Sequence, residues 1–317
     1  MKYKKIVVIG GGHGNAVMLR SLRKYTSDIT AIVSVADDGG SSGKLRRTLN
    51  IPPPGDLRNC IIALADPKSK MSELFDFRFN EGFLRWHNVG NLIIAALIKI
   101  NGSLPLAIKQ VSEVLAIEGR VLPVTTEQIS MKALLSTGRT VEGESHIPKY
   151  CAKTRSRIEQ VTLTPNCPKA MPECIRAILE ADAVVYSPGS LYTSLIPNLL
   201  VEGICEALET SKADKYYIVN AMTQRGETAK YSIEDHILGI EKHSGGKNII
   251  DYVIYNTQKV DDTIIKRYDK EGAGEVSHHI SKEYKKKYKL IGIPCITIDD
   301  KKVIHDSEAI WKCILDI

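Results

Sequence analysis

The chain is poor in aromatic residues, and its cysteines follow no metal-binding or disulfide pattern. Only 6% of the 317 residues are aromatic, and the seven cysteines form an odd set without a C-x-x-C pair. An odd set of unpatterned cysteines argues against a disulfide framework and against a zinc finger, and it fits reduced thiols. The scarcity of aromatics also leaves no series of rings on which the bases of a nucleic acid would stack.

Long apolar runs and a secretory leader are missing as well. The longest apolar stretch, from Leu92 to Ile98, is far too short to cross a bilayer. The chain begins with lysines that lead directly into an apolar strand, which is not the pattern of a signal peptide. The net charge of +6 is modest, and we interpret its densest basic run, residues 282–289, as a solvated surface. We therefore expect a cytoplasmic protein without membrane insertion and without a nucleic-acid partner.

What is present is a regular alternation of strand and helix patterns. Apolar runs of the strand type occur at 5–9, 29–35, 183–187, 215–220, 249–254 and near 293–298, and helical patterns at 172–181, 191–209, 233–243 and 261–270. Several of the runs are nearly continuous and β-branched, which is typical of parallel strands covered on both faces. The pattern predicts an α/β fold with a doubly wound, mostly parallel Rossmann-like sheet and right-handed crossovers.

Two segments depart from this alternation. Helical patterns follow one another at 56–65, 71–79, 88–100 and 103–115, whereas 120–165 shows short strands with a hairpin near Thr140. The chain contains no low-complexity linker. We therefore expect a single domain, 1–317, with a helical insertion at about 56–117 and a β-rich arm at about 120–165.

The first strand runs into a glycine-rich turn, Gly10-Gly11-Gly12-His13-Gly14-Asn15, and a helical pattern follows from Ala16. The start of a helix offers unpaired N–H groups and a partial positive charge, and glycines let an anion approach the backbone. The dinucleotide fingerprint is only partly met, because Asn15 stands where its third glycine would be. The turn either binds a phosphate or serves only the close packing of strand and helix.

Three more segments supply candidate ligand-binding side chains. The second strand ends in Ala36-Asp37-Asp38-Gly39-Gly40-Ser41-Ser42-Gly43-Lys44, which suits a ribose or a divalent cation but fails the spacing of a P-loop. A helix is expected to begin at Pro53-Pro54-Gly55-Asp56-Leu57-Arg58-Asn59. There Asp56 either caps the helix, or contacts a ligand together with Arg58, or does both. The next candidate segment is Trp86-His87-Asn88-Val89-Gly90-Asn91. Asn88 can cap the following helix, and Asn91 can contact a ligand. His87 is either an acid–base catalyst or a structural histidine.

The strands at 183–187 and 215–220 end in loops rich in hydroxyls and amides. Ser187-Pro188-Gly189-Ser190-Leu191-Tyr192-Thr193-Ser194 is not a nucleophile elbow, and Asn220-Ala221-Met222-Thr223 contains no nucleophile–base pair. Because parallel strands end at one edge of a sheet, we expect all these loops to meet in one crevice. The predicted ligand-binding residues are Gly10, Gly11, Gly12, His13, Gly14, Asn15, Asp37, Asp38, Gly39, Gly40, Ser41, Asp56, Arg58, Asn59, Asn91, Gly189, Ser190, Tyr192, Thr193, Ser194, Asn220, Met222 and Thr223.

Taken together, these motifs resemble the gluconeogenesis factor family (YvcK type). The resemblance extends to about residue 270 and rests on six motifs that occur in the same order. They are the glycine turn, the Asp37 loop, the Asp56 helix start, Gly90-Asn91-Leu92, the Ser190 loop and Met222-Thr223-Gln224-x-Gly226-Glu227-Thr228. The resemblance implies a fold shared with 2-phospho-L-lactate transferase (CofD-like). It also implies a cytoplasmic protein that binds a nucleotide sugar such as UDP-N-acetylglucosamine and is needed for cell shape and cell-wall synthesis under gluconeogenic growth.

Two departures from the family pattern concern charge. The family usually has threonine in place of His13 and proline in place of Arg225. Each departure either adds positive charge near a phosphate or reshapes the pocket for another ligand.

Three functions stay open at this point. The first is a regulator that binds a nucleotide sugar and needs no cofactor. The second is a Mg²⁺-dependent transferase of the 2-phospho-L-lactate type that acts on a nucleoside diphosphate-linked substrate, with Asp37, Asp38 or Asp56 holding the metal. The third, an NAD-dependent oxidoreductase, is disfavoured because the third glycine is missing and His87 is the one convincing proton donor. A homo-oligomer is compatible with each.

Overall fold

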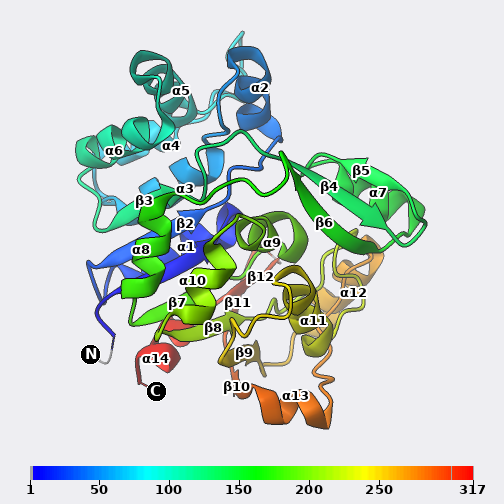
Figure 1. Ribbon diagram of the computed structural model, residues 1–317. Helices are drawn as coiled ribbons and strands as arrows, with labels where there is room; N and C mark the ends of the chain where they lie inside the picture. The colour runs from blue at the N-terminus through cyan, green and yellow to red at the C-terminus, as the bar shows by residue number, and fades with distance from the viewer. Residues whose placement is uncertain (1–2, 301, 317) are drawn as a thin grey trace.

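A seven-stranded parallel sheet forms the centre of the molecule (Figure 1). The structure is a computed structural model that describes residues 3–300 and 302–316. The strands lie in the order β10-β9-β8-β7-β1-β2-β3, and every neighbouring pair is parallel. Their bounds are β1 Ile6–Gly10, β2 Ile29–Val33, β3 Arg120–Pro123, β7 Ala183–Tyr186, β8 Asp214–Ile218, β9 Tyr252–Asn256 and β10 Lys289–Ile293. The predicted doubly wound, mostly parallel α/β fold is confirmed.

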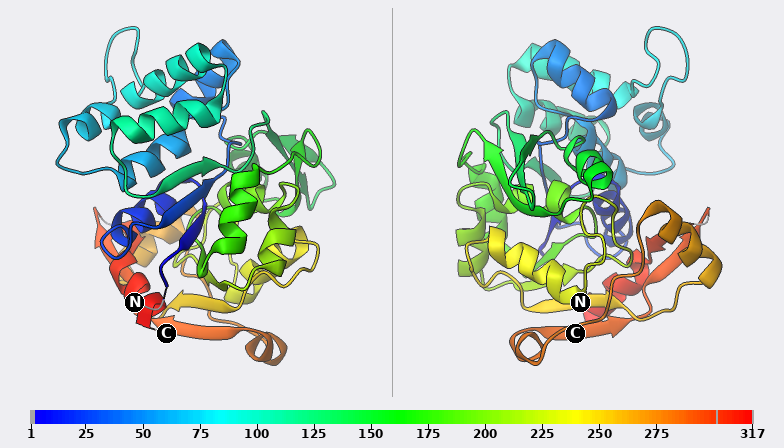
Figure 2. Two further views of the ribbon diagram at one scale, coloured as in Figure 1. Left: turned by 60° about the vertical axis from the view of Figure 1, so that its left-hand side comes forward. Right: turned by 90° about the vertical axis from the view of Figure 1, so that its right-hand side faces the viewer.

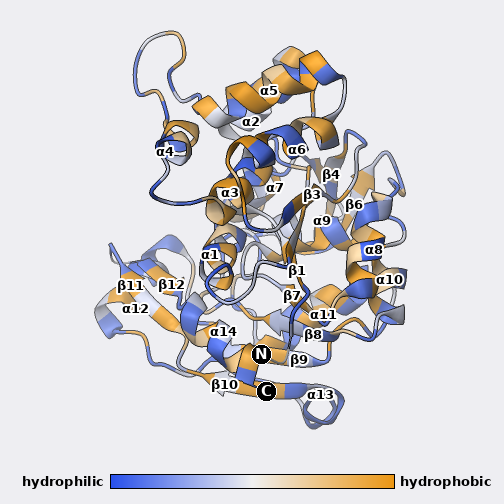
Figure 3. Cartoon of the chain, turned by 90° about the vertical axis from the view of Figure 1, so that its left-hand side faces the viewer, coloured by the Kyte–Doolittle hydropathy of each residue, from blue (hydrophilic) through white to orange (hydrophobic). Residues whose placement is uncertain are grey.

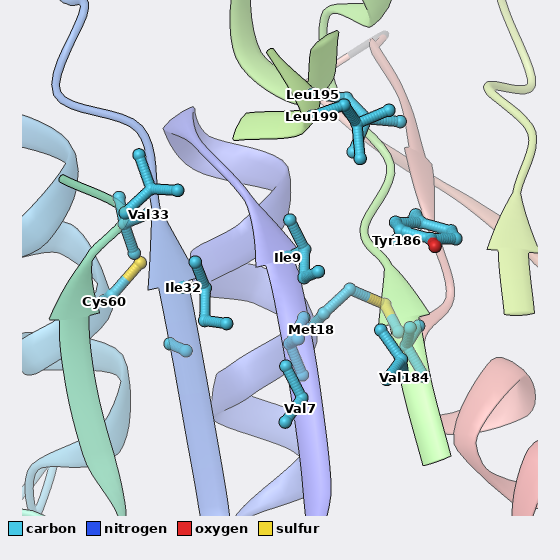
Figure 4. Packing of buried hydrophobic residues seen from close by; sticks show 14 of the residues in the cluster. Val7, Ile9, Met18, Ile32, Val33, Cys60, Val184, Tyr186, Leu195 and Leu199 are labelled. Carbon is cyan, nitrogen blue, oxygen red and sulfur yellow. The ribbon is translucent and has the colours of Figure 1, made fainter. Parts of the chain in front are cut away.

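The central strands are apolar on both faces because helices cover both. β1, β2 and β7 are buried along their whole length. Figure 4 shows side chains of these three strands packed with Met18 of helix α1 (Gly12–Leu22). Such burial of β-branched residues on two faces is what the continuous apolar runs predict.

The helices on the sheet pack in pairs. α1 contacts α3 (Gly55–Leu64) and the last helix, α14 (Ser307–Asp316), while α8 (Pro172–Glu180) contacts α10 (Ile204–Thr210). Trp311 of α14 donates its indole N–H to the carbonyl oxygen of Met18 over 2.9 Å. Three more helices lie in the C-terminal part of the chain: α11 (Ile233–His243), α12 (Asp262–Glu271) and α13 (Lys282–Lys287). The lysine-rich α13 is hydrophilic and blue in Figure 3.

The predicted run of helices connects β2 to β3 and begins earlier than expected. Helix α2 (Gly40–Leu49) starts inside the segment expected to be a loop after the second strand, and α3, α4 (Lys70–Asp76), α5 (Val89–Asn101) and α6 (Leu104–Val114) follow. The segment between α4 and α5 projects from this layer (Figure 2). The helices are therefore part of a long parallel crossover.

The β-rich arm begins at residue 130 rather than at 120. Residues 120–123 form β3, which pairs with β2 at the edge of the central sheet because Val121 and Pro123 are buried there. The arm itself is an antiparallel sheet of β5 (Thr140–Glu142), β4 (Ser130–Leu135) and β6 (Ile158–Thr164), joined by α7 (Ile147–Thr154).

Two other expected elements are divided. The helix expected over 191–209 consists of a π-helical turn (Leu191–Leu195), α9 (Ile196–Leu199) and α10. The helical path ends after Leu199, and α10 begins anew after its N-cap residue Gly203, which has a φ of 93°. The last expected strand, near 293–298, is two strands, the end of β10 and β11 (Ile296–Asp299), and β11 pairs with β12 (Lys302–His305). Within the described residues, every helix is too short or too polar to span a bilayer.

Candidate functional site

The site lies where the order of the strands reverses. β1 is flanked by β2 on one side and by β7 on the other, so the loops that follow β1 and β7 leave the sheet next to each other. The Ser187 N–H donates to the carbonyl oxygen of Ile9 over 3.0 Å, which joins the two strand ends. Such a switch point is where open α/β sheets bind their ligands.

The glycines of the first turn serve two purposes. A Cβ on Gly10 would overlap the Ser187 hydroxyl, and one on Gly14 would overlap the carbonyl oxygen of Pro188. These two glycines allow β1 and α1 to pack closely against the loop that follows β7. Gly12 has a φ of +66°, which favours glycine, and the backbone N–H of Gly12 donates to the Asp56 carboxylate.

A pocket of about 280 Å³ opens at the ends of β1, β7 and β8, and we call it the strand-end pocket. Its lining includes the predicted residues His13, Gly14, Gly189, Asn220, Met222 and Thr223, together with Gln224, Tyr268 and His305. His13 is exposed in the first turn of α1. Three of the predicted loops therefore meet in one hollow.

Hydrogen bonds fix the shape of the strand-end pocket. Asn220 holds Gly189 at two points, since its Oδ1 accepts from the Gly189 N–H (3.0 Å) and its Nδ2 donates to the Gly189 carbonyl (2.6 Å). Thr223 is also held at two points, since its N–H donates to the Gly274 carbonyl (2.7 Å) and its Oγ1 accepts from the Gly274 N–H (2.9 Å). Gln224 lines the pocket, and its Oε1 is buried without a hydrogen-bond partner among the described residues.

A second group of predicted residues forms a carboxylate cluster, which consists of Asp37, Asp38, Asp56 and Glu144. Asp37 accepts from the Gly39 N–H over 2.8 Å at the start of α2. Asp38 accepts from the Ser145 N–H over 2.9 Å, which ties the arm to the end of β2. Glu144 lies next to that contact, and its charge interacts with the three aspartates. The arm thus contributes a carboxylate that the sequence analysis did not single out.

Burial and mutual repulsion keep part of this cluster protonated near neutral pH. Burial raises the pKa of Asp56 to about 6, and the charge of Asp37 adds to the shift. Burial also raises the pKa of Glu144 to about 8, with further contributions from the aspartates and Glu227. The pKa of Asp37 is raised by burial as well. A bound cation would favour the charged forms of these carboxyl groups and would lower their pKa values.

The cluster is not a complete metal cage. Among the residues that the structure describes, His, Cys, Asp and Glu side chains nowhere form a group of three that could hold one ion. Mg²⁺ is commonly bound through only one or two carboxylates, with water and substrate phosphates as its other ligands. Asp37 and Asp56 are compatible with that mode.

The donors of the Ser190 loop are already used by a carboxylate. Glu227 is buried and accepts from the Tyr192 N–H (3.3 Å), from the Thr193 hydroxyl (3.2 Å) and from the Ser190 side chain. The Tyr192 hydroxyl lies 2.8 Å from that of Tyr231. These three predicted ligand contacts are therefore occupied within the protein, while Ser194 lies beside Gly11 and Gly12.

Some predicted residues lie away from the pocket. Asn15 is buried and donates to the Cys60 sulfur over 3.5 Å. Arg58 is buried on α3 and contacts Asn59 and Asp76. The Asn91 N–H donates to the Asn88 side chain over 3.2 Å, so Asn88 caps α5 as expected.

The remaining predicted residues lie at the start of α2. Gly39 is the N-cap residue of α2, and Gly40 is its first residue. Ser41 lies in the first turn, where its hydroxyl is 3.2 Å from the Nδ1 of His87. Burial lowers the pKa of His87.

Glu144, Glu227 and Tyr268 were not predicted as site residues. Glu227 does lie within a motif that carried the family resemblance. Glu144 and Tyr268 reach the site from the arm and from α12, at sequence distances that no local motif spans.

Known proteins resemble this chain over its whole length. The family model of 2-phospho-L-lactate transferase CofD matches residues 6–296. The gluconeogenesis factor of Bacillus subtilis is 42% identical over 314 residues, which cover 99% of this chain and 98% of that protein. The gluconeogenesis factor of Halalkalibacterium halodurans is 44% identical over 311 residues, which cover 98% of this chain and 93% of that protein.

A solved structure confirms the architecture. A crystal structure of a UPF0052 family member from Bacillus halodurans has a TM-score of 0.93 and 42% identity, and the match covers 98% of this chain and 99% of that one. The resemblance to the gluconeogenesis factors is confirmed. Fold, strand-end geometry and full-length similarity together show that the chain belongs to the CofD family and is a relative of the gluconeogenesis factors.

Proposed function

We propose that this protein binds a nucleotide sugar of the UDP-N-acetylglucosamine type in the strand-end pocket and acts as a cytoplasmic regulator of cell shape and cell-wall synthesis under gluconeogenic growth. The observation that carries the proposal is the lining of this pocket. It combines apolar side chains with the neutral polar residues Asn220, Thr223 and Gln224, and its described residues include no carboxylate, in a hollow at the switch point of the sheet. Neutral donors and acceptors of this kind bind phosphates and sugar hydroxyls without reacting with them.

The start of α1 supports the placement of the diphosphate. The first turn of α1 contains no acidic residue, and His13 lines the pocket there. The buried Asp56 carboxylate already accepts from the Gly12 N–H at this end of α1, so the helix dipole and His13 favour a diphosphate on the exposed side of the first turn. Tyr268 of α12 adds a ring to the lining, suited to a base or a sugar face.

The substitution His13→Glu tests this placement. A carboxylate in the first turn of a helix favours the helix but repels a diphosphate at the same position. We expect the melting temperature to stay the same or to rise, and the affinity for UDP-N-acetylglucosamine to fall about tenfold or more, measured by isothermal titration calorimetry. Arg20→Gln, at the exposed far end of α1, makes a similar change in charge and is expected to leave the affinity unchanged.

Equal affinities of the His13→Glu variant and the native protein would disprove the placement. Reduction of a nicotinamide cofactor, with no binding of the sugar nucleotide, would contradict the function itself. The free state of all seven cysteines agrees with the proposed cytoplasmic location.

The carboxylate cluster favours a second candidate function, a transferase of the 2-phospho-L-lactate type. Asp37 and Asp56 would hold Mg²⁺ against the diphosphate of a nucleoside-linked substrate, where the metal would neutralise the leaving group. Gly12 orients Asp56 through its N–H. Glu144 has a pKa of about 8 and thus retains a proton at neutral pH that it can exchange with an acceptor.

Turnover separates the two candidates. The transferase predicts Mg²⁺-dependent release of a nucleotide and a fall of at least about 100-fold in that rate in Asp56→Asn, measured by chromatography of the nucleotides. The regulator predicts that the sugar nucleotide is recovered unchanged, with and without Mg²⁺. Asp66→Asn, on an exposed turn remote from the cluster, is the matched control.

A further inference from the structure

A second large pocket lies between the arm and α12, and its walls are strongly basic. Its volume is about 520 Å³, and we call it the basic pocket. Figure 1 shows α7 and α12 on the same side of the molecule. The cationic residues of its lining are Arg155, Arg157, Arg225, Lys230 and Lys270, whereas its acidic residues are Glu227 and Asp269.

The five cations come from three separate parts of the fold. Arg155 ends α7 in the left-handed region with a φ of 56°, and Arg157 directly precedes β6. Arg225 and Lys230 belong to the turn after β8, and Lys270 belongs to α12. Residues so far apart in sequence converge on one hollow only because the chain folds them together.

The turn that carries Arg225 is rigidly seated. Gly226, with a φ of +83°, packs so closely against the Pro148 carbonyl of α7 that a Cβ would overlap it. The side chain of Arg225 lies across Gly272, where an added Cβ would be 3.4 Å from its Cδ. Packing on both sides of the turn therefore constrains its backbone and the inner part of the Arg225 side chain, and Arg225 lines the pocket.

The positive charge of the basic pocket is not neutralised within the described residues. Neither the three arginines nor the two lysines form an ion pair with any residue in 3–300 or 302–316. Glu227 is engaged by the Ser190 loop, and Asp269 is the other acidic residue in the described lining. The five cations are exposed, and grouped around one concave surface they create a positive potential that attracts anions.

We propose that the basic pocket binds a small free phosphorylated metabolite with two or more phosphate groups, at a site separate from the strand-end pocket. Guanidinium groups match the geometry of phosphate oxygens in pairs, and several converging cations favour a multivalent anion over a single carboxylate. The two pockets share no lining residue. The turn 224–228 separates them, because Gln224 lines one pocket and Arg225 lines the other.

The test uses inorganic pyrophosphate without metal and the full chain. We expect calorimetric titration of the His13→Glu variant to retain pyrophosphate binding at the basic pocket. Adding Arg157→Glu or Arg225→Glu to that variant is expected to weaken this binding about tenfold or more, since each removes a charge-assisted contact and adds repulsion. Lys286→Glu, on the exposed face of α13, makes the same change in charge elsewhere and is expected to leave the binding unchanged.

Three results would overturn the proposal. One is the absence of pyrophosphate binding in the His13→Glu variant, and another is an equal loss of affinity in Lys286→Glu, which would show a general charge effect. The third is displacement of pyrophosphate by duplex DNA or by anionic vesicles at equal phosphate concentration, which would assign the surface to a polymer or a membrane. Retained binding of UDP-N-acetylglucosamine in Arg225→Glu would show that the strand-end site is intact, so failure of one site is distinguishable from failure of the other.

Discussion

Single residues decide how charge is distributed at the ends of the strands. The glycine turn and the Ser190 loop both present backbone N–H groups, as their sequences predict, yet Asp56 and Glu227 accept hydrogen bonds from them. Sequence motifs identify donors well because glycine and serine mark them locally. They do not show which carboxylate will be buried against those donors, because that depends on contacts between distant segments.

The carboxylate cluster predicts an unusual dependence of stability on pH. The pKa of Glu144 is raised from 4.5 to about 8 on folding. The folded protein thus keeps a proton that the unfolded chain releases, so this contribution to stability is fully present below pH 4.5 and is lost as the pH rises through 8. We expect Glu144→Gln to raise the free energy of unfolding at pH 8 by ~1–2 kcal/mol and to flatten its pH dependence.

Urea unfolding at pH 5, 6.5 and 8 measures this effect. Glu142→Gln, on the exposed face of the neighbouring β5, is the matched control and is expected to change the free energy of unfolding by less than about 0.5 kcal/mol. A Glu144→Gln variant whose stability follows the native pH profile would show that Glu144 is not buried among the aspartates.

At the scale of elements, the strands with continuous apolar runs were predicted well, because burial on two faces leaves a clear signal. β3 is short, and only alternate residues of it are buried. Its sequence pattern therefore resembles that of the short strands in the arm that follows it. The helix over 191–209 was not predicted to break, because the positive φ of Gly203 is a property of the tertiary fold. The last helix, α14, was not predicted either, although it supports α1 directly.

The contact between α14 and α1 predicts a stability effect that reaches the candidate site. Trp311 is fully buried and bonds the Met18 carbonyl on the helix that begins at the glycine turn. Trp311→Phe keeps most of the packing and is expected to lower the free energy of unfolding by about 1–2 kcal/mol, whereas Trp311→Ala is expected to lower it by roughly 3–5 kcal/mol. Guanidinium unfolding monitored by circular dichroism measures both, and equal values for the two variants would contradict the role given to the ring.

At the scale of the whole molecule, one large hydrophobic cluster connects most of the layers, and a small second cluster of Met222, Val260 and Ile296 lies beside it. The large cluster includes buried residues of the central strands, of the helices between β2 and β3, of the arm and of α14. We propose on this basis that the described chain is one domain, with the helical layer and the arm as parts of it. The sequence suggested the same organisation from the lack of a linker, which is weaker evidence than continuous packing.

Calorimetry tests this proposal. A shared core predicts one cooperative heat-absorption peak, with equal calorimetric and van't Hoff enthalpies, because no part can lose its packing alone. Deleting residues 130–164, the arm, is expected to lower the transition temperature of what remains. Two resolved peaks in the native protein would divide the chain into separate folding units.

The position of Glu227 has a consequence for engineering. Its carboxylate acts as a built-in substitute for an external anion, and it holds the Ser190 loop in shape before any ligand arrives. Replacing Glu227 with alanine would open a vacancy about the size of one acid group at the start of that helical turn. Formate or acetate from the solvent would fit such a vacancy and restore the loop, which would make the protein a chemically rescuable switch.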